Sequence, residues 1–581
     1  MDESLDRPAY RTHPVHVFPW LDVRAGHEAL AARLAHRMDG AAAPALVAID
    51  GFVGVDWDTF IGHLRAALDR RGVAAHWLST EECFLPPAQV DTLLASTLTD
   101  DPVFGRLYRG HLEELWDARR VETTRAEIAA RARPTIVYGY GASRLSEGGI
   151  LVYADVPKDR GQELAAQGAI RTVGARAPED FGTMYKRLYF VDWPMLNRIK
   201  RAALPRIGLF VDATRSTEPV VVAGDALRRA LHALARQPFR VKPWFAPGPW
   251  GGQWMKEQFG LPPEQPNYAW SFELIAPENG LLLGDGARVI ECAFDALLWQ
   301  ETDAVLGEAV AARYGSYFPI RFDYLDTIGG TNLSCQVHPR LDYIRDEFGE
   351  SVTQDETYYV VTRKPGARVF LGLRDDTDIA RFKADALAAR DHAVPFDIGT
   401  HVNSVPSTPH DLFLIPSGTV HCSGADNVVL EISATPYIYT FKIYDYLRSD
   451  LQGHLRHVHL DHAFANIDAT RTATWVRERL IPEPVMVREG PTWAEYRLGD
   501  IDRLFFAIHR LEFSVAVEDD TGAKFVALNV VEGERCEIVT GDNPPVELRF
   551  AESIIIPASV GGYTLRNTGR KPCKVVKAFV K

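Results

Sequence analysis

The stretch GGTNLSCQVHPR, residues 329–340, is the most informative part of the central region. It carries Gln336 and His338 with a single residue between them. On a β-strand, residues i and i+2 point to the same face, so both side chains can project into one barrel interior. The stretch DLFLIPSGTVH, residues 411–421, brings His421 behind a turn shaped by Pro416 and Gly418. These two motifs together predict a metal-binding β-barrel.

Glu356 adds a carboxylate at the start of another strand candidate, QDETYYVV, residues 354–361. Two imidazoles, one carboxylate and one amide oxygen form a suitable set of ligands for a divalent metal, and imidazole favours zinc and its neighbours. His401 and His410 lie near the second motif in sequence, and we interpret them as surface or loop residues outside the site. The predicted metal ligands are Gln336, His338, Glu356 and His421.

The first third of the chain has a different rhythm. Short apolar runs at residues 45–50, 134–141, 149–157 and 207–214 alternate with amphipathic helical patterns. Strands that alternate with helices in this way are typical of a parallel α/β sheet with right-handed crossovers. We therefore predict an α/β domain at residues 14–215.

From residue 238 onward the sequence is dominated by short alternating segments that are separated by Gly, Pro and Asp. This pattern predicts β-barrel or jelly-roll domains. We place one at residues 238–462, interrupted by a helical insert at residues 375–392, and a smaller one at residues 465–581. The second has no histidine at its corresponding Ile-Pro turn, IIIPASVGG, so it could not hold a metal in the same way.

Composition limits the partners of the chain. Its 581 residues include 64 Lys and Arg against 77 Asp and Glu, a formal charge of -13. That balance argues against a nucleic-acid or anionic membrane surface. Six cysteines without a CxxC pair, no apolar signal region near the N-terminus and no run of ~20 apolar residues together predict a cytoplasmic protein with reduced thiols.

Residues 239–457 resemble type I mannose-6-phosphate isomerase. The resemblance rests on the Trp-Gly-Gly segment at residues 241–261, on LSCQVHP at 333–339, on the second histidine motif, and on VVLEIS and YDYLR at 428–433 and 444–448. It implies a cupin enzyme that binds one Zn²⁺ per chain through the four ligands above. It also implies interconversion of mannose 6-phosphate and fructose 6-phosphate by proton transfer through an enediolate.

The same resemblance implies that Glu431 is the acid/base and that Ser334 faces the phosphate. Two plainer interpretations stay open: Glu431 as a strand-end carboxylate paired with a Lys or Arg, and Ser334 as a hydrogen-bonded barrel serine. The chain departs from the family at Gln354, where a lysine is usual, and at Lys442, where an arginine is usual. Because Lys442 stands at the position of that arginine, we assign it a catalytic and substrate-binding role. Lysine keeps the positive charge of arginine but loses its bidentate fork. Further candidates for a rebuilt phosphate pocket are Arg448, Lys364 and Arg374.

The segment VAIDGFVGVDWDTFIGHL, residues 47–64, resembles the uridine-kinase-like P-loop group. A working loop needs G-x4-G-K-[ST], but here Asp56, Trp57 and Asp58 stand at the last three positions. Two carboxylates would repel a triphosphate. We therefore predict a kinase-like fold without kinase chemistry, which serves in packing, dimerisation or ligand sensing.

The leading hypothesis is thus a zinc-dependent isomerase of mannose 6-phosphate. Three alternatives stay open: a metal cupin that senses a sugar phosphate without turnover, an isomerase or epimerase of a related sugar phosphate, and a phosphotransferase that uses the N-terminal domain.

Overall fold

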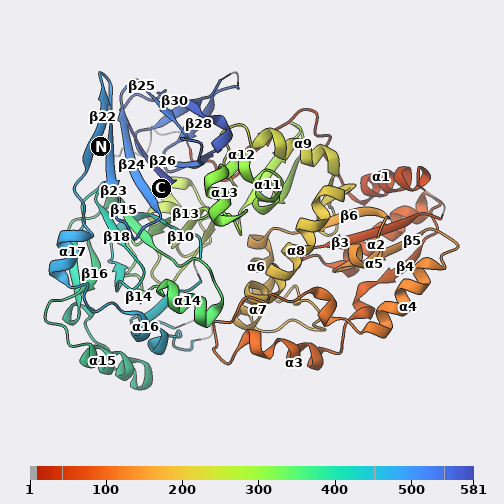
Figure 1. Ribbon diagram of the computed structural model, residues 1–581, viewed down its shortest axis with the longest axis horizontal. Helices are drawn as coiled ribbons and strands as arrows, with labels where there is room; N and C mark the ends of the chain where they lie inside the picture. Colours follow the sequence, from red (N-terminus) through yellow and green to blue (C-terminus); the bar gives the residue numbers. More distant parts are fainter. Residues whose placement is uncertain (1–8, 42–43, 437, 450–452, 542) are drawn as a thin grey trace. The chain divides into compact units, whose positions relative to one another are not determined.

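The computed structural model describes residues 9–41, 44–436, 438–449, 453–541 and 543–581, and these form two compact units (Figure 1). An α/β unit comprises Val15–Leu234 and Pro277–Glu301. A β-rich unit comprises Ala235–Ala276 and Thr302–Lys581 together with the segment that ends at Pro14. No helix among the described residues is both long and apolar enough to cross a membrane.

The α/β unit is built on a seven-stranded sheet in the order β2-β8-β7-β6-β3-β5-β4. The five strands from β7 to β4 run parallel, and β8 and β2 are antiparallel at one edge. The strands are β2 (Arg24–Ala25), β3 (Leu46–Gly51), β4 (His76–Ser79), β5 (Thr135–Tyr138), β6 (Ile150–Asp155), β7 (Leu209–Asp212) and β8 (Val220–Ala223). Their apolar side chains form a buried core with the helices, as near-continuous apolar strands require in a parallel sheet.

The helices of this unit connect the strands and pack on the sheet. They are α1 (His27–Asp39), α2 (Trp57–Arg70), α3 (Pro87–Leu98), α4 (Ala118–Ala129), α5 (Ala142–Leu145), α6 (Lys158–Ala166), α7 (Phe181–Arg187), α8 (Trp193–Ala203) and α9 (Gly224–Leu234), with a π-helical turn η4 (Leu188–Asp192) between α7 and α8.

The α/β unit differs from the predicted 14–215 domain because it reaches Leu234 and takes in Pro277–Glu301. The reason is a small sheet in which β1 (Val15–Val17) pairs in parallel with β11 (Gly280–Gly284), which pairs with β12 (Val289–Ala293). Helix α11 (Phe294–Gln300) follows directly. A pairing across more than 260 residues leaves no local sequence signal.

The first barrel of the β-rich unit consists of two sheets, one in the order β18-β15-β20-β13-β10-β9 and one in the order β17-β16-β19-β14-β21. Its strands are β9 (Trp244–Ala246), β10 (Trp270–Leu274), β13 (Ile320–Asp326), β14 (Cys335–Val337), β15 (Glu356–Arg363), β16 (Arg368–Leu373), β17 (Val402–Pro406), β18 (Leu412–Ile415), β19 (His421–Ser423), β20 (Asn427–Ala434) and β21 (Phe441–Tyr444).

The second barrel has a six-stranded sheet, β22-β23-β24-β31-β26-β29, and a four-stranded sheet, β25-β30-β27-β28. Between them lies a core of buried apolar side chains. The strands are β22 (Val485–Gly490), β23 (Trp493–Gly499), β24 (Phe506–Phe513), β25 (Ala516–Asp520), β26 (Val526–Glu532), β27 (Arg535–Val539), β28 (Val546–Arg549), β29 (Ser553–Ile556), β30 (Gly562–Asn567) and β31 (Cys573–Val580).

Helices in the β-rich unit lie outside these sheets. The predicted insert is helix α15 (Ile379–His392). The strands of the second barrel begin only at Val485, whereas the predicted barrel begins at residue 465; helix α16 ends at Asn466 and helix α17 occupies residues 473–479. The remaining helices are α10 (Trp254–Phe259), α12 (Thr302–Leu306), α13 (Glu308–Tyr314), α14 (Leu341–Phe348), α16 (Leu460–Asn466) and α17 (Ala473–Arg479).

Candidate metal centre

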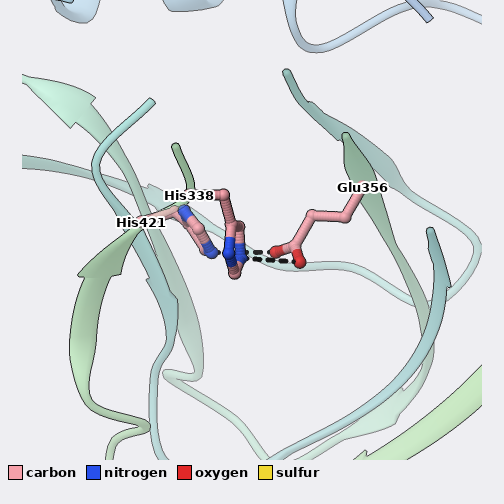
Figure 2. A group of neighbouring side chains, drawn as sticks. All are labelled: His338, Glu356 and His421. Carbon is pink, nitrogen blue, oxygen red and sulfur yellow. Dashed lines mark ion pairs between the residues drawn. The ribbon is translucent and has the colours of Figure 1, made fainter. Parts of the chain in front are cut away.

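Three of the predicted ligands converge inside the first barrel (Figure 2). His338 directly follows β14, Glu356 opens β15 and His421 opens β19. The Nε2 atom of His338 lies 3.0 Å from Glu356 Oε2, and Nε2 of His421 lies 2.8 Å from Oε1. All three side chains are at most 1% exposed. Ligand atoms of all three lie within 4.8 Å of one another, close enough to share one ion.

Strand pairing brings Gln336 to the same place. Gln336 and His421 are direct partners across β14 and β19, so their side chains share a face. The amide Nε2 of Gln336 lies 3.2 Å from His421 Nε2. A carboxamide offers an acceptor oxygen in place of this nitrogen after a half-turn of its terminal torsion. Gln336 can thus complete the predicted four-residue set.

The outward nitrogens of the two rings decide what the centre can hold. His338 Nδ1 lies 3.2 Å from the backbone oxygen of Tyr439, and His421 Nδ1 lies 2.9 Å from that of Thr419. An Nδ1–H that donates to a carbonyl leaves Nε2 as a lone pair, the usual arrangement of a metal-binding histidine. Apart from the ion pairs above, His338 Nε2 and Glu356 Oε1 have no hydrogen-bond partner among the described residues.

Two lone pairs and a carboxylate that face one another in a buried site repel unless a cation lies between them. The pKa shifts of Glu356 and His421 likewise favour a negative carboxylate next to a positive charge. Burial alone would raise the pKa of Glu356, but the histidines outweigh it and hold that pKa well below its usual range. Burial opposes a charge on His421, yet Glu356 raises the pKa of the imidazole. The residues therefore fit a divalent metal, with nitrogen and oxygen donors of the kinds that zinc accepts.

Gln354 contacts the candidate metal-binding carboxylate at Oε2, the oxygen that also faces His338. Its Nε2 donates to Glu356 Oε2 at 2.9 Å, and both side chains are buried. A neutral amide thus occupies the position where the family resemblance leads one to expect a lysine. It orients Glu356 without adding a positive charge to the centre.

Glu431 lies in the middle of β20 rather than at a strand end. It is opposite Tyr358 on β15 and Asp323 on β13, and so shares the barrel-facing side of the sheet with Glu356, two residues before Tyr358. Burial raises the pKa of Glu431, and the negative charge of Glu356 raises it further. Glu431 is therefore within electrostatic reach of the centre.

The side chain of Glu431 also has a buried cationic partner that the sequence analysis did not identify. Arg321, on β13, binds the Glu431 carboxylate and places its Nε 2.9 Å from Asp323 Oδ2. Ser433 donates a hydrogen bond of 2.9 Å to Glu431. Glu431 is thus paired with an arginine and also lies close to the candidate centre. Strand alternation in IRFDYLD was the one available signal, since Arg321 and Asp323 lie on one face.

Lys442 lies beside the centre on β21, where it is the direct partner of Gln336. Burial, helped by the charge of Arg456, lowers the pKa of Lys442 to about 8. No hydrogen-bond or ion-pair partner of its Nζ is recorded within the described part of the chain. The candidate base and the candidate cation therefore come from opposite sheets of the barrel.

Ser334 precedes β14, and its hydroxyl donates to Asp445 at 2.7 Å. Asp445 also forms ion pairs with Arg448 at 2.9 Å and Arg456 at 2.6 Å. In the structure Ser334 thus belongs to a hydrogen-bonded network around a carboxylate. An anion that approaches it would meet Asp445 as well as the two arginines.

The other candidates lie elsewhere. Lys364 pairs with Asp426 at 3.8 Å and Arg374 with Asp376 at 3.0 Å, and both side chains are about half exposed. His401 precedes β17 in a loop but is only 2% exposed, because it packs against the insert helix and contacts Asp385 at 2.7 Å. Of the two predicted alternatives, surface or loop, His401 therefore fits the loop and not the surface. His410 contacts Tyr359 and Glu532 away from the centre.

The turn before His421 links the three metal-binding segments. Gly418 donates its N–H to the backbone oxygen of His338 at 2.9 Å. Ser417 donates its N–H to Asp355, the neighbour of Glu356, at 2.8 Å. Gly418 has φ +87°, and a Cβ there would lie 3.1 Å from the backbone oxygen of Asn466, so the position requires glycine.

Arg471 holds this turn from the segment between α16 and α17. Its Nη1 donates to the backbone oxygens of Pro416 at 2.6 Å and Ser417 at 2.7 Å, and it also bonds Thr419 Oγ1. Its Nε forms an ion pair of 3.1 Å with Asp468. Arg471 is not identifiable from the sequence, because nothing in TRTATW, residues 470–475, distinguishes a buried arginine from a surface one.

Comparisons with known proteins divide the chain in the same way as the fold. Residues 26–236 match the model of a family described as a domain of unknown function, DUF8485. The chain is also similar to curated mannose-6-phosphate isomerases. ManA of Bacillus subtilis is 24% identical over 340 residues, 57% of this chain and 96% of the relative.

The mannose-6-phosphate isomerase of Streptococcus mutans is 24% identical over 317 residues, 54% of this chain and 89% of the relative. Among solved structures, the mannose 6-phosphate isomerase of B. subtilis aligns with 59% of this chain and 99% of its own, at 19% identity and a TM-score of 0.47. Sequence similarity to named isomerases thus extends over more than half of this chain.

Proposed function

We propose that the β-rich unit is a metal-dependent aldose–ketose isomerase that interconverts mannose 6-phosphate and fructose 6-phosphate. One observation carries the proposal. A buried His–Glu–His group presents converging lone pairs inside the barrel, in a chain that is similar to named mannose-6-phosphate isomerases over about 57% of its length. Similarity at 24% identity does not by itself identify the sugar, so the choice of substrate rests on the chemistry of the site.

Gln336, His338, Glu356 and His421 would hold the metal, which we propose is Zn²⁺. When bound, it would act as a Lewis acid that polarises the substrate oxygens. The protein residues around it must then do three things: move a proton between C2 and C1, balance negative charge on oxygen, and hold the substrate in register.

Glu431 is our candidate for the proton transfer. A general base works best when its pKa approaches the working pH, and burial together with Glu356 moves the pKa of Glu431 in that direction. Arg321 and Ser433 hold the carboxylate on one rotamer. The carboxylate would accept the proton from C2 and return it to C1 on the same face of an enediolate.

Lys442 is our candidate for balancing the oxyanion. It stands next to Gln336 without a recorded partner among the described residues, so its charge is available to a substrate oxygen. A compact ammonium makes a point contact where a guanidinium would make two parallel bonds. Lysine in place of arginine at position 442 thus retains the positive charge but fixes the orientation of a bound oxygen less tightly.

The test is a coupled assay of fructose 6-phosphate formation from mannose 6-phosphate by the metal-loaded full chain. His338→Ala and His421→Ala should each lose most bound metal and turnover. His392→Ala, an exposed histidine on α15, is the matched control and should keep both. Full turnover by either ligand variant with its metal retained would refute the ligand assignment.

The changes at Gln354 and Lys442 favour one second candidate, a metal cupin that binds a sugar phosphate without turning it over. Metal content does not separate the two functions, but turnover does. Metal-dependent binding of mannose 6-phosphate by a fully loaded chain that never forms fructose 6-phosphate would establish the second candidate.

A further inference from the structure

The α/β unit contains a cavity of about 270 Å³ at the carboxyl ends of β3, β4 and β5. It lies between the start of α2 on one side and the loop of residues 168–178 on the other. In open α/β sheets, ligands bind in the crevice outside the carboxyl ends of the strands. The position is thus one where this architecture leaves room for a ligand, and its lining shows which kind.

The start of α2 is closed to phosphate groups. Asp56 caps the helix by accepting the N–H of Thr59 at 3.1 Å, and Asp58 stands in the first turn. The indole of Trp57 lies against Gly51, where even a Cβ would be 2.9 Å from its ring carbons. Carboxylates and an aromatic ring therefore occupy the helix end that would otherwise attract an anion.

The walls of the cavity are aromatic. Trp57 packs edge-on against Tyr140 with ring centroids 5.7 Å apart, and Tyr138 is 6.4 Å from Trp57. Phe84 lines the opposite part. Aromatic faces bind the apolar face of a flat or ring-shaped molecule, as is usual in small-molecule sites.

The polar groups lie around these walls. Asp58 and Glu81 present exposed carboxylates, and Arg171 pairs with Glu81 at 3.0 Å. Arg176, on the loop, is exposed. Hydroxyl groups can donate to the carboxylates and accept from the guanidinium groups, so this lining suits a molecule with many hydroxyls.

The loop over the cavity is held in place by a buried ion pair. Asp192 accepts the N–H of Val173 at 3.0 Å, Arg187 donates to the Val173 oxygen at 2.8 Å, and the two side chains are 3.0 Å apart. Both are at most 6% exposed. Asp192 ends the π-helical turn η4, a feature that often marks functional sites. A buried ion pair adds little stability by itself, but this one fixes both backbone groups of Val173 and keeps the cavity preformed.

We propose that this cavity binds an unphosphorylated sugar ring. Its volume suits one small ring, since sites for drug-sized ligands span ~300–1000 Å³. Acidic groups outnumber basic ones, because Asp56, Asp58 and Glu81 face Arg176 and an Arg171 already paired with Glu81. A phosphate would therefore meet net negative charge. This binding function concerns the α/β unit and does not depend on the isomerase activity.

The experiment is saturation-transfer NMR on the full chain with D-mannose and D-glucose as probes, in parallel with mannose 6-phosphate and ATP. The His338→Ala background removes the metal centre as a competing sugar site. We expect saturation transfer to the ring protons of at least one free hexose, and none to ATP.

Two surface variants locate the site. Asp58→Ala and Glu81→Ala should each weaken hexose binding at least tenfold. The exposed neighbour Glu82, which does not line the cavity, provides the control Glu82→Ala, with unchanged binding. Introduced instead into the chain with His338 intact, all three should keep its thermal midpoint and any isomerase turnover.

Three outcomes would overturn the proposal: no transfer to either hexose, transfer that Glu81→Ala and Asp58→Ala leave unchanged, or variant-sensitive binding of mannose 6-phosphate or ATP in place of the free sugar. Loss of isomerase turnover by itself would bear only on the metal centre.

Discussion

Arg471 gives the sharpest test of how the fold positions the candidate metal centre. Its guanidinium is buried, 2% exposed, and holds the turn that carries His421 through the oxygens of Pro416 and Ser417. It touches no predicted ligand. Replacing it with methionine keeps an unbranched apolar side chain and removes every donor.

The cost follows from the groups left behind. Arg471→Met removes the side-chain donor of the Ser417 oxygen and the cationic partner of Asp468, whereas Thr419 still donates to the Pro416 oxygen and Thr470 to Asp468. A buried polar group left without a partner costs about 1–3 kcal/mol, and Asp468 is 24% exposed, so its lost ion pair costs less than a fully buried one. We therefore expect a loss of about 1–3 kcal/mol of unfolding free energy. Because outer partners of metal ligands typically change affinity by about 10–100-fold, metal affinity should fall by the same range.

Urea unfolding and a metal-competition titration measure the two effects. Arg471→Lys, which keeps one charged donor, should recover part of both. Arg477→Met, an exposed arginine on α17, is the matched control and should change neither. A folded Arg471→Met chain with unchanged metal affinity would show that the turn positions His421 without the arginine, and would refute the reasoning.

Three further predictions concern the candidate metal, Lys442 and a buried carboxylate on β23 of the second barrel, Glu495. Chelation should abolish turnover and lower the unfolding temperature, and added Zn²⁺ should restore both; a chelator-resistant rate would exclude the metal from the reaction. Lys442→Ala should lower kcat at least ~100-fold with little change in metal content, as removal of an oxyanion donor does, whereas Lys442→Arg should retain most of the rate; equal rates in both would contradict the oxyanion role. Burial opposes the charge of Glu495, yet His509, Lys577 and Arg488 lower its pKa to about 2. A lowered carboxyl pKa stabilises the fold above pH ~4.5 and ceases to as pH falls through 2. Glu495→Gln should thus cost about 3 kcal/mol at pH 7 and about 1 kcal/mol at pH 3 in urea unfolding; a pH-independent difference would argue for lost packing instead.

The sequence predicted those parts of the centre that local pattern encodes. Gln336 lies on β14 and His338 directly follows that strand, and the Pro-Gly turn before His421 has the positive φ at Gly418 that glycine permits. The apolar runs of the first third became parallel strands because a sheet covered on both faces needs continuous apolar segments.

The contacts that surround the candidate ligands could not be predicted from the sequence, because they depend on pairing between distant segments. The family resemblance implies Lys442 itself, but not its pairing with Gln336 more than 100 residues away; the contact of Arg321 with Glu431, 110 residues apart, is equally invisible in the sequence. Arg471 and the turn it holds come from segments 55 residues apart. An arginine in a single sequence carries no mark of burial, so the residues that orient the centre emerged only from the fold.

Charge balance connects these distant residues to the proposed reaction. Three carboxylates, those of Glu356, Glu431 and Asp323, lie buried around the centre with two cations, Arg321 and Lys442. The group is net negative by one without a metal and net positive by one with a divalent ion. Only the second state can accept a substrate that develops negative charge in a buried site. The neutral Gln354 fits this balance, because a lysine there would make the metal-free barrel neutral and weaken its hold on the ion. The neutral Gln354 therefore keeps the metal-free group negative, which favours binding of a cation, and it leaves Lys442 as the cation that would meet the substrate in the proposed reaction.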